Sequence, residues 1–305
     1  MLVHLVPITA LLAGIALLLL GTGLTGTLLV VRGSLEGFGD GYLGLLGSAY
    51  FVGFLVGGLV SPPLVRRVGH IRAFAFFAAA VAAILLLHGL VVRPLAWVVL
   101  RGLTGVALVA VYTIIESWLN SHAPRQQRGR IFAVYMAVNL GALALAQQLL
   151  RWDDPAGFTL FAVAALMVCL AAMPVAATRL TPPPAHGGSR LGVAALWRSA
   201  PVAVAGAALS GLAMGAFWGL GPLYAAKIGL RDEGVALFMS MAIVGGAVFQ
   251  LPLGALSDHC DRRLALVAVA TLAAVVAMAL IPAVGMGPRS LAAVAFVYGG
   301  MAFAV

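Results

Sequence analysis

The chain has 305 residues, of which 63% are hydrophobic and only 9% are charged. Soluble domains carry about 25% charged residues, so this composition excludes a soluble enzyme. Apolar stretches of about 20 residues run without alternation, which predicts membrane-spanning helices and excludes a transmembrane β-barrel. We therefore expect an all-α polytopic membrane protein.

Ten apolar segments are expected to span the bilayer, because charged residues, prolines and clustered glycines interrupt the apolar sequence between them. In chain order they are 7–31, 41–65, 71–92, 95–118, 131–150, 158–177, 201–225, 234–256, 264–283 and 290–305. We expect the first to be a span and not a signal peptide, since no Lys or Arg precedes it and its apolar run exceeds a signal core.

The basic residues predict how these spans are oriented. With the N-terminus in the cytoplasm, eleven Lys and Arg residues fall in cytoplasmic connections and six in external ones. The positive-inside rule favours this arrangement, in a plasma or inner membrane. The formal net charge of +9 then reflects topology. It does not indicate nucleic-acid binding, because short separate loops cannot form one basic surface.

A connection rich in proline and glycine, residues 178–200, is expected to be a cytoplasmic linker. It divides an N-terminal half of six spans, 1–177, from a C-terminal half of four, 201–305. The last span stops at Val305 without a polar flank, so we expect a C-terminally truncated chain. A shift of 192 residues pairs Gly53 with Gly245 and Ser48 with Ser240, which indicates a duplicated half.

One loop of the C-terminal half carries a recognisable motif. Gly254 is followed four residues later by Asp258 and then by the basic pair Arg262 and Arg263. This resembles the signature between spans 8 and 9 of the major facilitator superfamily. The resemblance implies a bundle of two pseudo-repeated six-helix halves, of which about ten of the usual twelve spans are present, moving around a central cavity.

The equivalent loop of the N-terminal half departs from this signature. Pro62 stands at the glycine position and Arg66 at the aspartate position. A gating role is nevertheless expected in both halves, by resemblance. In this loop it is expected for Arg66, Arg67, Gly69 and Arg72, with Glu116 as the acid that could pair with the arginines. In the other half it is expected for Gly254, Asp258, Arg262 and Arg263. The alternative for Asp258 is a plain helix cap.

The fourth span matches the family through Arg101 and Gly105. The stretches Ile115–Trp118 and Gly221–Tyr224 look most like the YcaD-like branch. In the fifth span, Asn139-Leu-Gly141 is followed by no Gly-Pro pair, which argues against a drug/proton antiporter.

A charge deep in lipid costs roughly 3 kcal/mol on insertion scales, so Arg101 must face protein or water. Thr104, Tyr112 and Glu116 fall on the same face of the helix. We interpret this stripe as lining a substrate pathway, with packing as the alternative. If Arg101 contacts the substrate, anions are favoured, because a guanidinium binds carboxylates with two parallel hydrogen bonds.

Three more residues are expected on the pathway. Asn139 and Gln147 share a face of the fifth span and could bond to substrate or hold helices together. Trp218 belongs to an apolar wall on the seventh span, with interfacial anchoring as the favoured alternative.

These features predict secondary active or facilitative transport of a small organic solute by alternating access, in a monomer embedded in the lipid bilayer. The alternatives are a transport-inactive fragment and an intramembrane enzyme. Ser48, Ser210 and Ser240 lack nucleophile-elbow glycines on both sides, and no metal or phosphate-binding motif occurs, so we expect no catalytic residue, metal or cofactor. No carboxylate lies near the middle of a span, which leaves Glu116, His88 or no residue at all for ion coupling.

Overall fold

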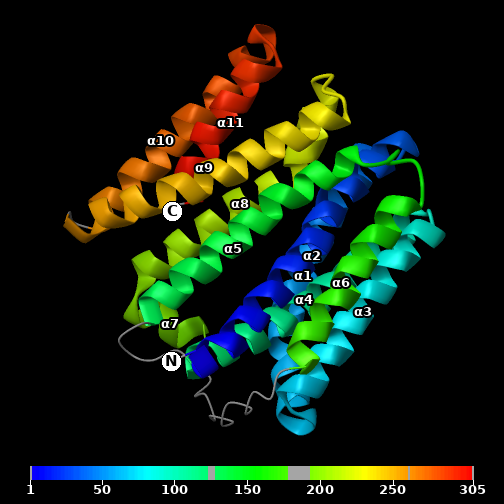
Figure 1. The fold of residues 1–305 in the computed structure, drawn as a ribbon. Coiled ribbons are helices and arrows are strands. Elements are labelled where there is room, and N and C mark those ends of the chain that lie inside the picture. Colours follow the sequence, from blue (N-terminus) through cyan, green and yellow to red (C-terminus); the bar gives the residue numbers. More distant parts are fainter. Residues whose placement is uncertain (1, 123–127, 178–192, 260–261, 304–305) are drawn as a thin grey trace.

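The computed structural model describes residues 2–122, 128–177, 193–259 and 262–303, and every regular element in these ranges is a helix (Figure 1). The long helices are α1 (Leu2–Leu35), α2 (Asp40–Val68), α3 (His70–Leu90), α4 (Pro94–His122), α5 (Arg128–Gln148), α6 (Thr159–Ala177), α8 (Pro201–Lys227), α9 (Asp232–His259), α10 (Arg262–Ala283) and α11 (Pro288–Ala302). The short elements are α7 (Val193–Ser199), η1 (Leu149–Arg151) and η2 (Val284–Met286).

The all-helical membrane fold predicted from the sequence is confirmed. Among the described residues, eight helices are long and apolar enough to cross a membrane. The apolar part of α6, Thr159–Val175, and helix α11 are shorter. Each of the ten predicted segments overlies one long helix, and α2 and α4 continue three to four residues beyond the predicted ends. Most of the linker 178–200 lies outside the described residues.

Proline and glycine set the helix boundaries. Pro94, Pro201 and Pro288 open α4, α8 and α11, where a missing N–H costs no helical hydrogen bond. Gly69 alone separates α2 from α3, with a φ of 85° that a residue with a side chain rarely adopts. Its N–H still donates to the carbonyl of Val65, so the turn is closed.

Two helix pairs pack through glycines that bring their backbones into contact. In the pair α2–α4, Gly53 lies against the Gly102 carbonyl group and Gly105 against the Tyr50 carbonyl oxygen. In the pair α9–α11, Gly245 and Gly299 lie in the same way against backbone carbonyls of the facing helix. Lipid tails are as apolar as the side chains, so no hydrophobic force drives helices together within the bilayer. Close packing is therefore a main source of helix association.

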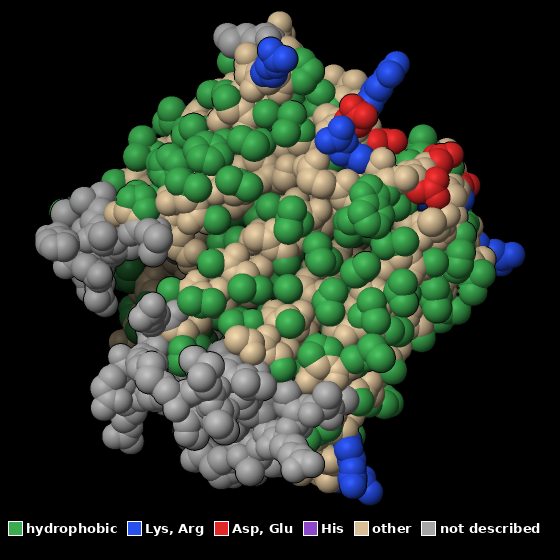
Figure 2. Space-filling view, in the orientation of Figure 1, with side chains coloured by type: hydrophobic (Ala, Val, Ile, Leu, Met, Phe, Trp, Pro, Cys, Tyr) green, Lys and Arg blue, Asp and Glu red, His purple; other side chains and the backbone are tan. Residues whose placement is uncertain are grey.

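Helix α1 runs through the centre of the bundle formed by α1 to α6. Gly14 and Gly21 lie against backbone carbonyls of α6, and Gly23 lies against Leu143 and Ala146 of α5. The C-terminal helices join this bundle where α5 packs on α9 and α2 packs on α8. In Figure 2, apolar side chains cover the middle of the visible face and charged side chains gather near its ends, as expected for a bilayer-embedded protein.

Candidate functional site

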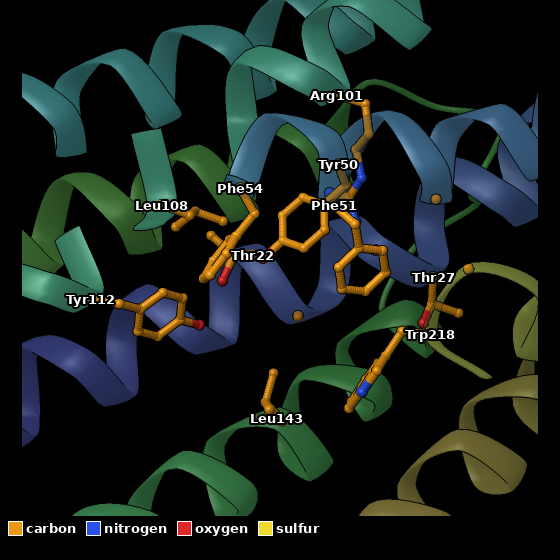
Figure 3. A pocket seen from close by; sticks show the side chains of 14 residues that line it. Thr22, Thr27, Tyr50, Phe51, Phe54, Arg101, Leu108, Tyr112, Leu143 and Trp218 are labelled. Atoms are coloured by element: carbon orange, nitrogen blue, oxygen red, sulfur yellow. The ribbon is translucent and has the colours of Figure 1, made fainter. Parts of the chain in front are cut away.

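A cavity of about 280 Å³ lies where five helices meet, four from the N-terminal bundle and α8 from the C-terminal part. Figure 3 shows its wall. The lining residues are Thr22, Gly23, Gly26 and Thr27 of α1, Gly47, Tyr50, Phe51 and Phe54 of α2, Arg101, Leu108 and Tyr112 of α4, Leu143 of α5, and Trp218 and Gly219 of α8.

Arg101 places a positive charge in this wall. Its guanidinium carbon lies 4.5 Å from the centre of the Tyr50 ring, within the range of a cation–π interaction. Gly26 of α1 leaves room beside it, since a Cβ at that position would lie 3.6 Å from Nη2. No carboxylate of the described residues forms an ion pair with Arg101. The charge is therefore balanced by an aromatic face and not by an acid.

The rest of the wall is mostly aromatic. Tyr50 contacts Phe51 edge to face, with ring centres 5.2 Å apart, and Phe54 lies 6.2 Å from Tyr112. Trp218 closes the cavity from α8 and stacks on Phe303 of the chain's last described residues, at 5.8 Å and 18°. We call Tyr50, Phe51, Phe54, Tyr112 and Trp218 the aromatic wall.

Two threonines of α1 reach the cavity, but their hydroxyl protons are already used. Thr22 donates to the carbonyl of Leu18 at 2.9 Å. Thr27 donates to the side-chain oxygen of Gln147 on α5. These hydroxyls therefore present only lone pairs to the cavity.

The cavity is closed at the end of the bundle that carries Asp40, which we call the Asp40 end. Gly47 of α2 lies directly against Gly219 of α8, so that the two backbones touch. Nearer the end, Asp40 pairs with Lys227 of α8. A second ion pair joins Arg151 to Glu233 of α9, at 3.8 Å. Contacts between the N-terminal bundle and α8 or α9 thus seal this side.

The predicted pathway residues divide into two groups. Arg101, Tyr112 and Trp218 line the cavity. Thr104 is buried and donates to the carbonyl of Leu100, while Asn139 donates to the carbonyl of Tyr135, one turn back on its own helix. Gln147 is fully buried behind the wall.

The predicted gating residues lie at the opposite end, which we call the Arg66 end. Arg66, Arg67 and Arg72 are exposed there, and Gly69 forms the turn between their helices. Glu116 accepts a hydrogen bond from Tyr135 at 3.3 Å, and within the described residues it forms no ion pair with these arginines. Gly254 and Asp258 belong to α9, and Arg262 and Arg263 begin α10, but their side chains lie outside the described part.

The sequence did not predict three of the five residues of the aromatic wall, nor either threonine. Tyr50, Phe51 and Phe54 are aromatic residues in an apolar helix. In such a helix the sequence does not distinguish an aromatic residue that faces a cavity from one that faces lipid. A weak signal existed in α1, because Thr22, Thr25 and Thr27 are closely spaced polar residues in a mostly apolar helix.

Gln147 connects α5 to α1, and its loss should be costly. Its side-chain oxygen accepts from Thr27, and its nitrogen donates to the carbonyls of Gly23 and Leu143, both at 3.3 Å. We expect Gln147→Leu to lower the free energy of unfolding by about 1–2 kcal/mol, since hydrogen bonds between membrane helices are of that order. The matched variant Asn139→Leu, whose bond lies within one helix, should cost less than about 0.5 kcal/mol.

Unfolding of the two variants in mixed micelles of increasing denaturing-detergent content measures this difference. Equal stability of the two variants would mean that the bond from α5 to α1 contributes nothing of its own.

The profile of the Major Facilitator Superfamily matches residues 6–305. An uncharacterized MFS-type transporter of Enterobacter sp. strain 638 is 29% identical over 265 residues, covering 85% of this chain and 69% of the relative. The uncharacterized MFS-type transporter YcaD of Escherichia fergusonii is 27% identical over 262 residues, with the same coverage.

Among solved structures, the nucleoside transporter NupG superposes with a TM-score of 0.72 at 14% identity. The match covers 100% of this chain and 80% of that one. At this identity the likeness concerns the fold.

Proposed function

The chain belongs to the major facilitator superfamily, and from this premise we propose that it carries a small organic solute across the membrane by alternating access. As a member of this family it is a multi-pass membrane transport protein. The proposal assigns it no catalytic residue, metal ion or cofactor, and treats the monomer as the working unit.

The observation that carries the proposal is the cavity itself. It lies at the junction of α1, α2, α4 and α5 with α8, so both parts of the chain line it. It is sealed at the Asp40 end by contacts between those same parts. A site that is shared by two helical bodies and closed on one side fits a carrier whose halves rock around it. We take 1–177 and 201–305 as these halves and 178–200 as the linker.

The distribution of Lys and Arg residues favours one orientation of the protein in the membrane. With the N-terminus in the cytoplasm, as the positive-inside rule favours, the Asp40 end is external. On this orientation we infer that a state sealed at the Asp40 end is inward-facing. Closing the Arg66 end would let Glu116 exchange its hydrogen bond from Tyr135 for an ion pair with an arginine of the first loop. We assign the matching role in the other half to Asp258, Arg262 and Arg263.

Alternating access can be tested without knowing the solute. We would replace Cys169 and Cys260 by serine, introduce Leu143→Cys in the cavity wall, and apply a membrane-impermeant maleimide to right-side-out and inside-out vesicles. The cavity cysteine should react from both sides. Leu55→Cys, on an exposed apolar position of α2, should react from neither.

Two further positions test the orientation in the same vesicles. Glu36→Cys, before α2, should react only from outside, and Arg198→Cys, in α7, only from inside. Reaction of the cavity cysteine from one side alone would contradict alternating access and support a transport-inactive protein.

A further inference from the structure

The charge on the cavity lining restricts which solutes can enter the cavity. Arg101 contributes a positive charge, because a guanidinium stays protonated in proteins. No other described lining residue is of a charged type. A cationic solute would meet this positive charge without an acid to balance it, whereas an anion would supply the missing counter-charge. The electrostatic field in the cavity therefore favours anionic over cationic solutes, whatever contacts they go on to make.

The geometry around Arg101 suits a carboxylate. The guanidinium carbon lies 4.5 Å from the centre of the Tyr50 ring, and no acceptor among the described residues takes an Arg101 N–H group in a hydrogen bond or ion pair. Gly26 keeps α1 from covering Nη2 with a side chain. A planar fork with free N–H groups binds a carboxylate through two parallel hydrogen bonds, and one positive charge matches one negative charge.

The rest of the cavity suits a planar apolar body. One face of Trp218 is covered by Phe303, and the residue lines the cavity beside Phe51. Thr22 and Thr27 have donated their hydroxyl protons to protein oxygens, so they offer no hydrogen-bond donor to a ligand. Aromatic rings attract a planar ring in stacked or edge-to-face contact.

The volume of the cavity indicates the size class of its ligand. A cavity of about 280 Å³ lies near the lower end of the range of about 300–1,000 Å³ that is usual for small-molecule pockets. A small solute is therefore favoured over a large one.

We infer that this cavity binds a small planar monocarboxylate, with the carboxylate on Arg101 and the ring against Trp218. The inference rests on the proposed transport function and specifies its substrate class. It excludes organic cations and neutral polyols as preferred solutes.

The test is a series of probes that share one ring and chain length and differ in charge: phenylacetate, phenylacetamide and phenethylamine. Binding to the full chain in lipid nanodiscs would be measured by calorimetry. Phenylacetate should bind at least about tenfold more tightly than the amide, because a hydrogen bond to a charged group is worth more than one between neutral groups. Phenethylamine should show no binding in the same concentration range.

Variants assign the two contacts separately. Arg101→Gln should remove the preference for the acid over the amide, and Arg101→Lys should retain only part of it, since an ammonium lacks the fork. Trp218→Ala should weaken both probes about tenfold while preserving the preference, because stacking does not depend on charge. Arg93→Gln, at an exposed arginine eight residues before Arg101, is the control and should change nothing.

Different results would overturn the monocarboxylate assignment and the proposed transport function. Absence of phenylacetate binding by the wild-type protein, tighter binding of phenethylamine, or an unchanged preference in Arg101→Gln would each overturn the monocarboxylate assignment. A cavity cysteine that still reacts from both sides would leave transport standing in those cases. Reaction from one side alone would instead overturn transport, and phenylacetate binding would then mark a binding site without a carrier cycle.

Discussion

Replacing Gly53 by alanine is expected to destabilise the folded protein by about 3 kcal/mol, at the upper end of the usual cost of overpacking. A Cβ at this position would lie 2.7 Å from the carbonyl carbon of Gly102 and 3.0 Å from its Cα. The obstacle is backbone, which has no rotamer by which to move aside. Helices α2 and α4 would have to separate, and their packing would be lost along the whole contact.

The same helix supplies a matched control. Gly58 lies five residues further along α2, is exposed, and has no heavy atom of a neighbouring element within 4 Å of the place where an alanine Cβ would lie. Gly58→Ala should be neutral or stabilising by up to about 1 kcal/mol, because alanine is the better helix former. Fluorescence-detected thermal unfolding of both variants measures the contrast. Equal unfolding temperatures would show that the α2–α4 contact is not as close as the structure has it.

The contrast between Gly53 and Gly58 also shows how much of the fold can be predicted from the sequence. Spans are readable because every backbone group in lipid must be satisfied within its helix, which forces long apolar stretches. Packing partners are not readable, because both glycines sit in one apolar helix and only the position of α4 distinguishes them. The 192-residue shift that pairs Gly53 with Gly245 did identify two glycines with the same close backbone contact.

The residues of the candidate site likewise include some that the sequence predicts and others that depend on how the helices pack. Arg101 stands out in the sequence because a charge inside a span demands an explanation. For Gln147 the sequence left two roles open, a contact with substrate and a bond between helices, and in the structure its amide is hydrogen-bonded to Thr27 and Gly23 of α1. Tyr50 could not be found in this way, because its role depends on α2 and α4 approaching until Arg101 lies over its ring.

The contact between Gly47 and Gly219 leads to the second large effect. It joins α2 to α8 at the Asp40 end, and in the proposed transport cycle it is broken when that end opens. A Cβ at Gly47 would lie 2.8 Å from the Cα of Gly219, again against backbone. Gly47→Ala should therefore raise the free energy of this state relative to one in which α2 and α8 have moved apart, without disturbing the packing inside either bundle.

A penalty of about 1.4 kcal/mol, within the usual cost of overpacking, corresponds to a tenfold shift of population. In the Leu143→Cys background, labelling of the cavity from the Asp40 end should then rise about tenfold, and labelling from the Arg66 end should fall. Gly44→Ala is the control, because its Cβ would meet only the Leu220 side chain at 3.8 Å. A fall in labelling from both ends would indicate misfolding, and unchanged labelling would remove this contact from the gate. Opposite changes at the two ends are the result that only a moving contact between α2 and α8 produces.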